Sequence, residues 1–240
     1  MNLVTFVAAG ASSATDGGGP PTPGLPAGIA EGDLMVCAFY SREVTDGGVT
    51  PRTPGWAQVL SDRSAGGLLA VFAKNYQSGD AALTFVLTGH VGGAAGNDCL
   101  AQIAAWRNAD SAVQLSMLRT TPAAVDIGTI DGVTLNPREV VLVIGGKLDD
   151  WTSVAVLSGN GLTWAEIGEP DSTAGADAGM VWDYAINGDT ETLVTAKSFV
   201  VTGGTAVQGK GVMVKLIPND DAIIYRRKRI AAQRMRLVEA

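Results

Sequence analysis

The sequence predicts an all-β protein: an antiparallel β-sandwich of jelly-roll type, followed by a C-terminal α-helix. Three observations support this fold class. Short apolar runs recur between Gly, Asp and Pro residues, no segment before residue 220 shows a helical period with caps, and the chain contains an internal repetition. Of 240 residues, 46% are hydrophobic, only 17% are charged and 31 are Gly, which favours strands joined by tight turns.

Each strand is indicated by its pattern of apolar residues. The stretch LTWAEI (162–167) alternates apolar and polar residues, which suits a half-buried antiparallel strand. DLMVCAFY (33–40) and EVVLVIGG (139–146) are almost continuously apolar, which suits central strands of packed sheets. In chain order we expect strands at Leu3–Ala9, Asp33–Ser41, Trp56–Ser61, Leu68–Tyr76, Ala82–Thr88, Cys99–Trp106, Val113–Leu118, Val140–Gly146, Leu162–Ile167, Gly179–Ile186, Thr192–Val201 and Gly211–Ile217.

The first residues, MNLVTFVAAGASSA, have an apolar run before small residues, as a signal peptide does. They lack a basic n-region, and Thr5 interrupts the run. We therefore expect a first strand here and no secretion by this route. No window approaches the roughly 20 apolar residues of a membrane helix, so no membrane partner is predicted.

The two halves of the chain resemble each other. Trp56 aligns with Trp164, which is 108 residues further on, and Gly79-Asp80 aligns with Gly188-Asp189 at a similar offset. The connector between the halves contains strand-like material and no flexible linker. We predict one sandwich domain over residues 1–218, with pseudo-repeats at about 25–110 and 130–218; two small sandwiches are the alternative.

A series of motifs resembles a known group of proteins. LPAGIAEGDLMVCAFYS (25–41) is followed by TPGWAQVLSDRS, LLAVFAKNYQSGD, AAWRNAD, LNPREVVLVIGG and GLTWAEIG. This order, from about Leu25 to Pro218, resembles a group of tailed-bacteriophage virion proteins. The resemblance implies a tail-associated, fibre-associated or head-decorating structural protein, assembled in the host cytoplasm and located in the virion. It brings no catalytic signature.

Candidate catalytic and metal-binding groups are few. Cys37 and Cys99 lie in apolar strand-like runs without a CxxC spacing, so we expect two buried free thiols. The single histidine, His90, lies in a predicted turn, and no GxSxG motif accompanies it. We expect no enzyme activity, no metal and no cofactor.

Two groups of acids lie in predicted loops. Asp149 and Asp150 form one group, and Glu166, Glu169 and Asp171 form the other. Solvated loop acids are the favoured interpretation. A calcium site and a pair of glycosidase acids are alternatives, but neither group has an EF-hand pattern or a partner at a defined offset.

Trp151 is the best candidate for contact with a sugar ring, because it follows Asp149 and Asp150 in a predicted connector. Interface or core packing is the alternative for this side chain. The other tryptophans lie within strand patterns, where packing is expected. A carbohydrate- or receptor-binding module that recognises a host-surface glycan through Trp151, Asp149 and Asp150 is therefore the second functional hypothesis.

The end of the chain predicts a basic amphipathic helix over residues 219–240. Pro218 ends the last strand, and Asn219, Asp220 and Asp221 can cap a helix. From Ala222 onward Gly and Pro are absent, while apolar residues repeat at seven-residue intervals among basic ones. The residues expected to contact a partner are Ile223, Ile224, Arg226, Arg227, Lys228, Arg229, Ile230, Arg234, Met235 and Leu237.

Charge separates this segment from the rest of the chain. Residues 1–221 hold 11 Lys and Arg against 23 Asp and Glu, a net charge of −12, whereas residues 222–240 hold six basic residues and one acid. We favour docking on an acidic neighbouring or identical subunit. A helix folded back on its own domain, nucleic-acid binding and a membrane-surface helix are the alternatives. The leading hypothesis is a non-enzymatic virion protein that forms homo-oligomers or binds other virion proteins.

Overall fold

The protein is all-β in the part of the chain that the structure describes. A computed structural model describes residues 3–15, 19–42, 48–64, 66–88, 98–114, 119–120, 126–149, 151–172 and 178–219. Within these ranges there are antiparallel strands and no helix, which confirms the predicted fold class at that level. The predicted helix over residues 219–240 lies outside the described residues except for Asn219.

The first larger sheet is built from residues 5–107. Its strand order is β1-β8-β3-β6-β5, and β2 continues the β1 edge by pairing with β8. The strands are β1 (Thr5–Ala9), β2 (Ser13–Thr15), β3 (Leu34–Ser41), β5 (Ala57–Ser64), β6 (Gly67–Asn75) and β8 (Cys99–Arg107).

The second larger sheet uses the same order of strands further along the chain. β21 lies between β13 and the edge strands β9 and β10, and β13 is followed by β17 and β15. Short β16 also pairs with β17. The strands are β9 (Ala109–Gln114), β10 (Arg119–Thr120), β13 (Val140–Lys147), β15 (Trp164–Gly168), β16 (Asp171–Ser172), β17 (Ala178–Ile186) and β21 (Gly209–Pro218).

Local geometry gives the same correspondence between the sheets. The backbone N–H of Ala30 donates to the Asp33 carboxylate over 2.8 Å, and that of Asn136 donates to the Glu139 carboxylate over 2.9 Å. Each acid precedes the central strand of its sheet. β3 therefore corresponds to β13, β6 to β17, and β8 to β21. The boundaries of the pseudo-repeats, 25–110 and 130–218, stay a prediction.

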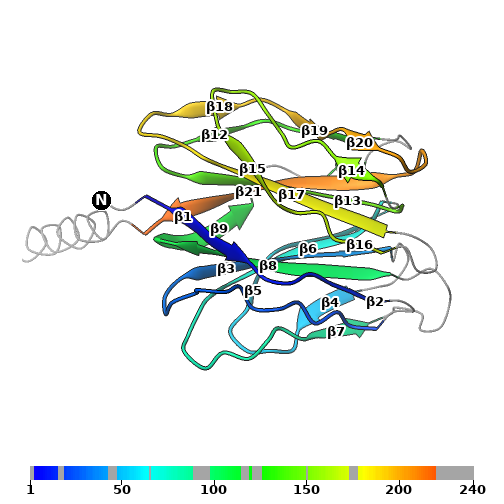
Figure 1. The fold of residues 1–240 in the computed structure, drawn as a ribbon, viewed down its shortest axis with the longest axis horizontal. Coiled ribbons are helices and arrows are strands. Elements are labelled where there is room, and N and C mark those ends of the chain that lie inside the picture. The colour runs from blue at the N-terminus through cyan, green and yellow to red at the C-terminus, as the bar shows by residue number, and fades with distance from the viewer. Residues whose placement is uncertain are drawn as a thin grey trace, which may run out of the picture.

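The two larger sheets pack against each other through one face, and short strands cover the opposite faces (Figure 1). On β3 and β13 the residues facing the other sheet alternate with those facing outward. Because both faces are covered, the central strands are buried throughout, which explains their continuous apolar runs. The covering pairs are β4 (Gly48–Pro51) with β7 (Phe85–Thr88), β11 (Ile127–Ile130) with β19 (Lys197–Phe199), β12 (Val133–Leu135) with β18 (Thr192–Val194), and β14 (Ser153–Val154) with β20 (Val201–Thr202).

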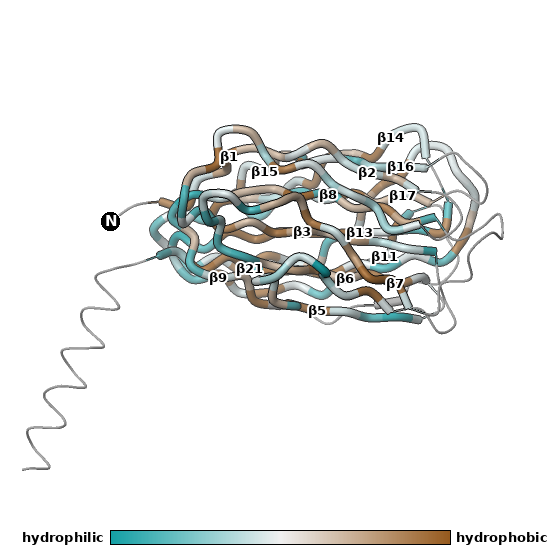
Figure 2. The backbone as a smooth tube through the Cα atoms, turned by 90° about the horizontal axis from the view of Figure 1, so that it is seen from below, coloured by the Kyte–Doolittle hydropathy of each residue, from teal (hydrophilic) through white to brown (hydrophobic). Residues whose placement is uncertain are grey.

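The short covering strands are where the sequence-based prediction fails most. The run expected as one strand, Thr192–Val201, is divided into β18, β19 and β20, which pair with three different partners. Each covering ladder joins only two strands of two to four residues, which is too short for an alternating pattern to define their boundaries. Along the tube in Figure 2, hydrophobic segments are concentrated in the strands, and many hydrophilic ones lie near the ends of the sheets.

A polar pair joins the two larger sheets inside the core. The Trp182 Nε1–H donates to Oε1 of Gln102 over 2.7 Å, and Nε2 of Gln102 donates to the Gly10 carbonyl over 3.2 Å. Gln102 is 8% exposed and Trp182 is fully buried. This bridge satisfies the indole N–H, which would otherwise be desolvated without a partner.

We expect the substitution Gln102→Leu to lower the free energy of unfolding by about 1–3 kcal/mol, because the buried Trp182 N–H loses its acceptor. Urea unfolding followed by tryptophan fluorescence measures this change. The matched substitution Gln77→Leu, at an exposed position, should change stability by less than about 0.5 kcal/mol. Equal stability of both variants would contradict a role for the bridge.

Candidate functional site

Trp151, the predicted sugar-contacting residue, is 6% exposed and belongs to the core beneath the outer layer of the second sheet. Its ring lies directly over Gly179, where an added Cβ would be 2.5 Å from the indole. Stacking on a sugar needs an open ring face. The geometry therefore matches the packing alternative for Trp151.

The acids next to Trp151 differ in what can be described. Asp149 is 8% exposed, and its carboxylate accepts hydrogen bonds from the Thr205 backbone N–H and, over 2.8 Å, from the Thr205 hydroxyl. These bonds fix a loop within the chain. Asp150 lies outside the described residues, as do all ten predicted partner-binding residues from Ile223 to Leu237, so their proposed roles stay predictions.

Both cysteines are free and buried, as the sequence predicted. Burial raises the pKa of the Cys37 thiol, and a hydrogen bond with the Gln102 backbone only partly opposes that effect. A thiol held neutral in this way is a poor nucleophile. Among the described residues there is no group of three or more His, Cys, Asp and Glu side chains arranged to hold a metal ion.

A buried carboxyl, Asp183 on β17, was missed by the sequence analysis. It is 1% exposed; Oδ2 accepts the Leu157 N–H over 2.7 Å, while Oδ1 is buried without a hydrogen-bond partner. Burial, aided by the charges of Glu166 and Glu169, raises the pKa of Asp183 to about 7. The only sequence signal is a single acid inside the apolar run GMVWDYAI.

Glu169 belongs to the same acidic group. Burial, with the charges of Glu166 and Asp171, raises its pKa, although the Val154 N–H donates to it over 3.1 Å. The Trp151 indole N–H opposes this rise in the Glu169 pKa, although it makes no hydrogen bond of normal geometry. Glu166 and Asp171 are exposed, in line with solvated acids, whereas Glu169 is half-buried. Glu166 and Asp171 lie in strands β15 and β16, not in the predicted loops.

A buried carboxyl with a raised pKa is a common feature of general acid–base sites. Glu166 is exposed and is the strand partner of Asp183 on β15. Asp183, however, is closed off from solvent. A substrate could not reach it without movement of the covering layer, so this pair has the geometry of a structural group.

An open groove lies between the edges of the two larger sheets. It has a volume of about 540 Å³ and is bordered by β5, the end of β6 and β9. Its lining includes Leu34, Ala57, Ala73, Asp110 and Ala112. A second hollow of about 510 Å³ continues it past Lys74 and Asn75 toward the turn that holds Asp80.

The opposite seam between the sheets is closed, and the strand correspondence shows why. Phe6 and Tyr184 stack across that seam with ring centroids 5.0 Å apart. Phe6 pairs with a residue of β8, and Ala112 pairs with a residue of β21. These two partner residues occupy corresponding positions in their sheets, so Phe6 and Ala112 are equivalent. By the same register Tyr184 is equivalent to Ala73. Two aromatic rings close one seam, and two alanines leave the other open.

The rim of the groove carries fixed charges. The Lys74 ammonium lies 2.6 Å from the Asp80 carboxylate and donates to the Pro54 carbonyl over 3.1 Å. Burial acts against the ionised Asp80, but its bonds with Lys74 and the Gln77 N–H outweigh that effect and lower its pKa. Asp110 is exposed, and within the described part of the chain no cation is recorded in an ion pair with it. The groove therefore combines an apolar floor with a rim that can bind a cation.

No described helix is long and apolar enough to span a membrane. Comparison with known proteins gives no further identification: no family model, no curated protein and no solved structure matches this chain.

Proposed function

We propose that this chain is a non-enzymatic structural protein of a tailed-phage virion that is held in the particle by packing against neighbouring subunits. The observation that carries the proposal is the open seam between β5 and β9, which offers a ready-made docking groove. The motif resemblance over residues 25–218 supplies the phage setting. In this proposal the sheets form a jelly-roll sandwich, and residues 219–240 form a helical anchor.

The groove has the features of a protein-binding surface. Its lining combines apolar side chains, among them Leu34, Val59 and Ala73, with polar ones such as Gln58 and Asp110. It is bordered by the edge strands β5 and β9. Protein interfaces commonly combine an apolar centre with a polar rim, and open strand edges are frequent docking positions. Within the described residues, the strongly shifted carboxyl Asp183 is enclosed, so it gives no support to an enzymatic alternative.

Deletion of residues 222–240 tests the proposal. Antibody labelling in electron microscopy should show the full-length protein at regular positions on the head or tail of purified particles. We expect the deletion to reduce incorporation at least about tenfold, because the anchor contributes more than about 1.4 kcal/mol to docking. Circular dichroism should show that the β-sheets remain folded.

The control is Leu193→Ser, since Leu193 is 63% exposed on a covering strand far from the groove lining. This variant should enter particles normally. Particles without label, or normal incorporation of the deletion variant, would remove the proposal in its present form.

A further inference from the structure

We propose that the groove between β5 and β9 binds the C-terminal segment, residues 220–240, of a second copy of this chain. This inference rests on the proposed function for its biological setting. It adds the receiving surface and the identity of the partner, namely another copy joined head to tail.

The groove is the place where the two similar halves of the structure differ, because one seam between the sheets is filled and the other is open. At the closed seam, the Phe6 and Tyr184 rings fill the position that Ala112 and Ala73 leave open. Since protein interiors are normally close-packed, an apolar space of this size at the edge of the core is suited to side chains from another segment. Ile223, Ile224, Tyr225, Ile230 and Leu237 provide such side chains in residues 220–240.

The described chain ends beside this groove. Pro218 is the strand partner of Ala109, and the Asn219 N–H donates to the Asn108 carbonyl over 2.7 Å. The groove lining begins at the next residue of β9, Asp110. Twenty-one residues follow Asn219. Even a helix of that length spans about 30 Å, which is enough to reach a neighbouring copy.

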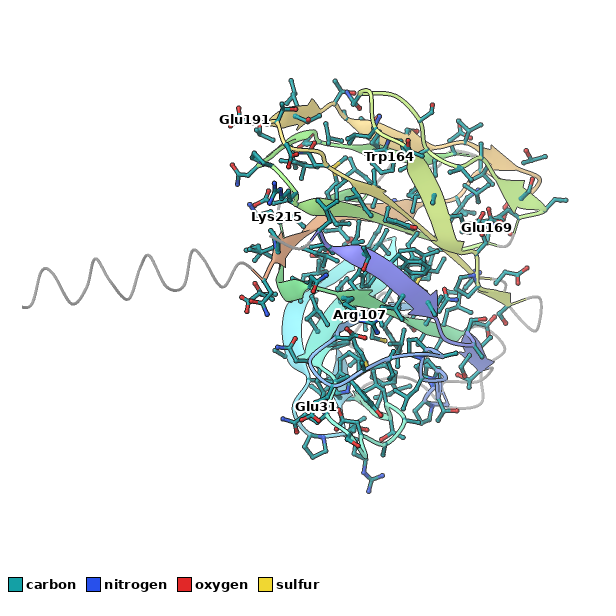
Figure 3. The ribbon with its side chains drawn as sticks, turned by 60° about the vertical axis from the view of Figure 1, so that its left-hand side comes forward. Glu31, Arg107, Trp164, Glu169, Glu191 and Lys215 are labelled. Atoms are coloured by element: carbon teal, nitrogen blue, oxygen red, sulfur yellow. The ribbon has the colours of Figure 1, made fainter. Side chains whose placement is uncertain are left out.

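Charge favours the same contact. Residues 1–219 contain 11 basic and 21 acidic residues, whereas residues 220–240 contain six basic and three acidic residues. Asp110 lies on the groove itself, and the exposed Glu31 and Glu191 lie at the same end of the sheets as Lys215 (Figure 3). The basic side chains at this end, Arg107, Arg138 and Lys215, are each paired with another acid of the chain. The additional exposed acids therefore favour contact with a basic segment of another copy.

The topology favours exchange between copies over folding back. β9 lies between β21 and the groove, because it pairs with β21 on one side and lines the groove on the other. To enter its own groove, the segment that follows β21 would have to turn back across the start of β9. A segment from a second copy needs no such turn, because that copy can approach the groove from outside. Each copy offers one groove and one segment, which gives a heterologous contact that forms rings or filaments.

A mixing experiment with full-length variants tests this inference. In A73Y/A112F the groove is filled by the residue types that close the opposite seam, and in I230S/L237S the segment loses two apolar side chains. Sedimentation velocity should show concentration-dependent association of the wild type and a monomer for each variant alone. An equimolar mixture of the two variants should recover a species of twice the single-chain mass, because one intact groove meets one intact segment.

Two further variants guard against effects on folding. Asp110→Lys changes only an exposed rim charge and should weaken association at least about tenfold, with a smaller dependence on salt. Asp171→Lys makes the same change at an exposed site remote from the groove and should associate as the wild type does. Val86→Phe, which adds an aromatic ring at a position 42% exposed on β7, should also associate normally.

The outcomes separate this inference from the proposed function. Association of A73Y/A112F at wild-type strength, or a mixture that stays monomeric, would overturn the groove as the receptor for a second copy. A wild-type monomer whose segment is protected from protease in a groove-dependent manner would identify the chain's own segment as the occupant and overturn the exchange. Loss of particle incorporation on deletion of residues 222–240 would uphold the proposed function in either case.

Discussion

The substitution Gly146→Ala is expected to lower the free energy of unfolding by about 3 kcal/mol, which corresponds to a fall in Tm of about 10 °C for a domain of this size. A Cβ at Gly146 would lie 2.3 Å from the ring of Tyr40, far inside van der Waals contact. Tyr40 is fully buried on the central strand of the other sheet, and its hydroxyl donates to the Gly66 carbonyl over 2.7 Å. The ring therefore has no free space into which it can move.

Thermal and urea unfolding of Gly146→Ala measure the effect. The matched control is Gly188→Ala, where an added Cβ meets no atom within 4 Å and the backbone is not left-handed. That variant should be neutral or more stable by up to about 1 kcal/mol, because alanine reduces the entropy of the unfolded chain.

Combining Gly146→Ala with Tyr40→Leu should restore part of the lost stability, because the smaller side chain makes room for the methyl group. A Gly146→Ala protein as stable as the wild type would show that the two sheets can separate slightly at this position without loss of packing energy.

The pH dependence of stability should change strongly in Asp183→Asn. In the wild type, the pKa of Asp183 rises from 3.8 to about 7 on folding because the carboxyl is buried beside Glu166 and Glu169. The folded state therefore binds more protons than the unfolded state between these two pH values. It follows that the free energy of unfolding contributed by this group is greatest below about pH 4 and falls as the pH rises to about 7.

The size of this fall is at most about 4 kcal/mol, the free energy that corresponds to a difference of about three between the two pKa values. The asparagine side chain has no carboxyl proton to lose, so the variant should lack this part of the fall between pH 4 and 7. Urea unfolding at a series of pH values measures it. A wild-type slope in Asp183→Asn would show that the buried carboxyl is solvated.

The all-β class, most of the long central strands and the likeness of the two halves could be predicted from the sequence. DLMVCAFY and EVVLVIGG are apolar throughout because both faces of β3 and β13 are covered, and this local pattern does not depend on knowing what covers them. The buried state of Cys37 and Cys99 followed from the same runs. These features depend on residues that are close together along the chain, so they can be predicted from a single sequence.

Only the tertiary structure decided the environment of single side chains. Trp151 follows two acids in the sequence, yet its ring packs on Gly179, which lies on a later strand of the chain, β17. Asp183 sits in a strand pattern like any other, and its raised pKa depends on enclosure by the layer that contains Leu157. The groove depends on Ala73 and Ala112, which are meaningful only when compared with Tyr184 and Phe6 across the opposite seam. Burial, pKa and open space are properties of contacts between distant segments. Hydrophobic periodicity therefore predicted the central strands, whereas the short covering strands and the groove depend on how the strands pack.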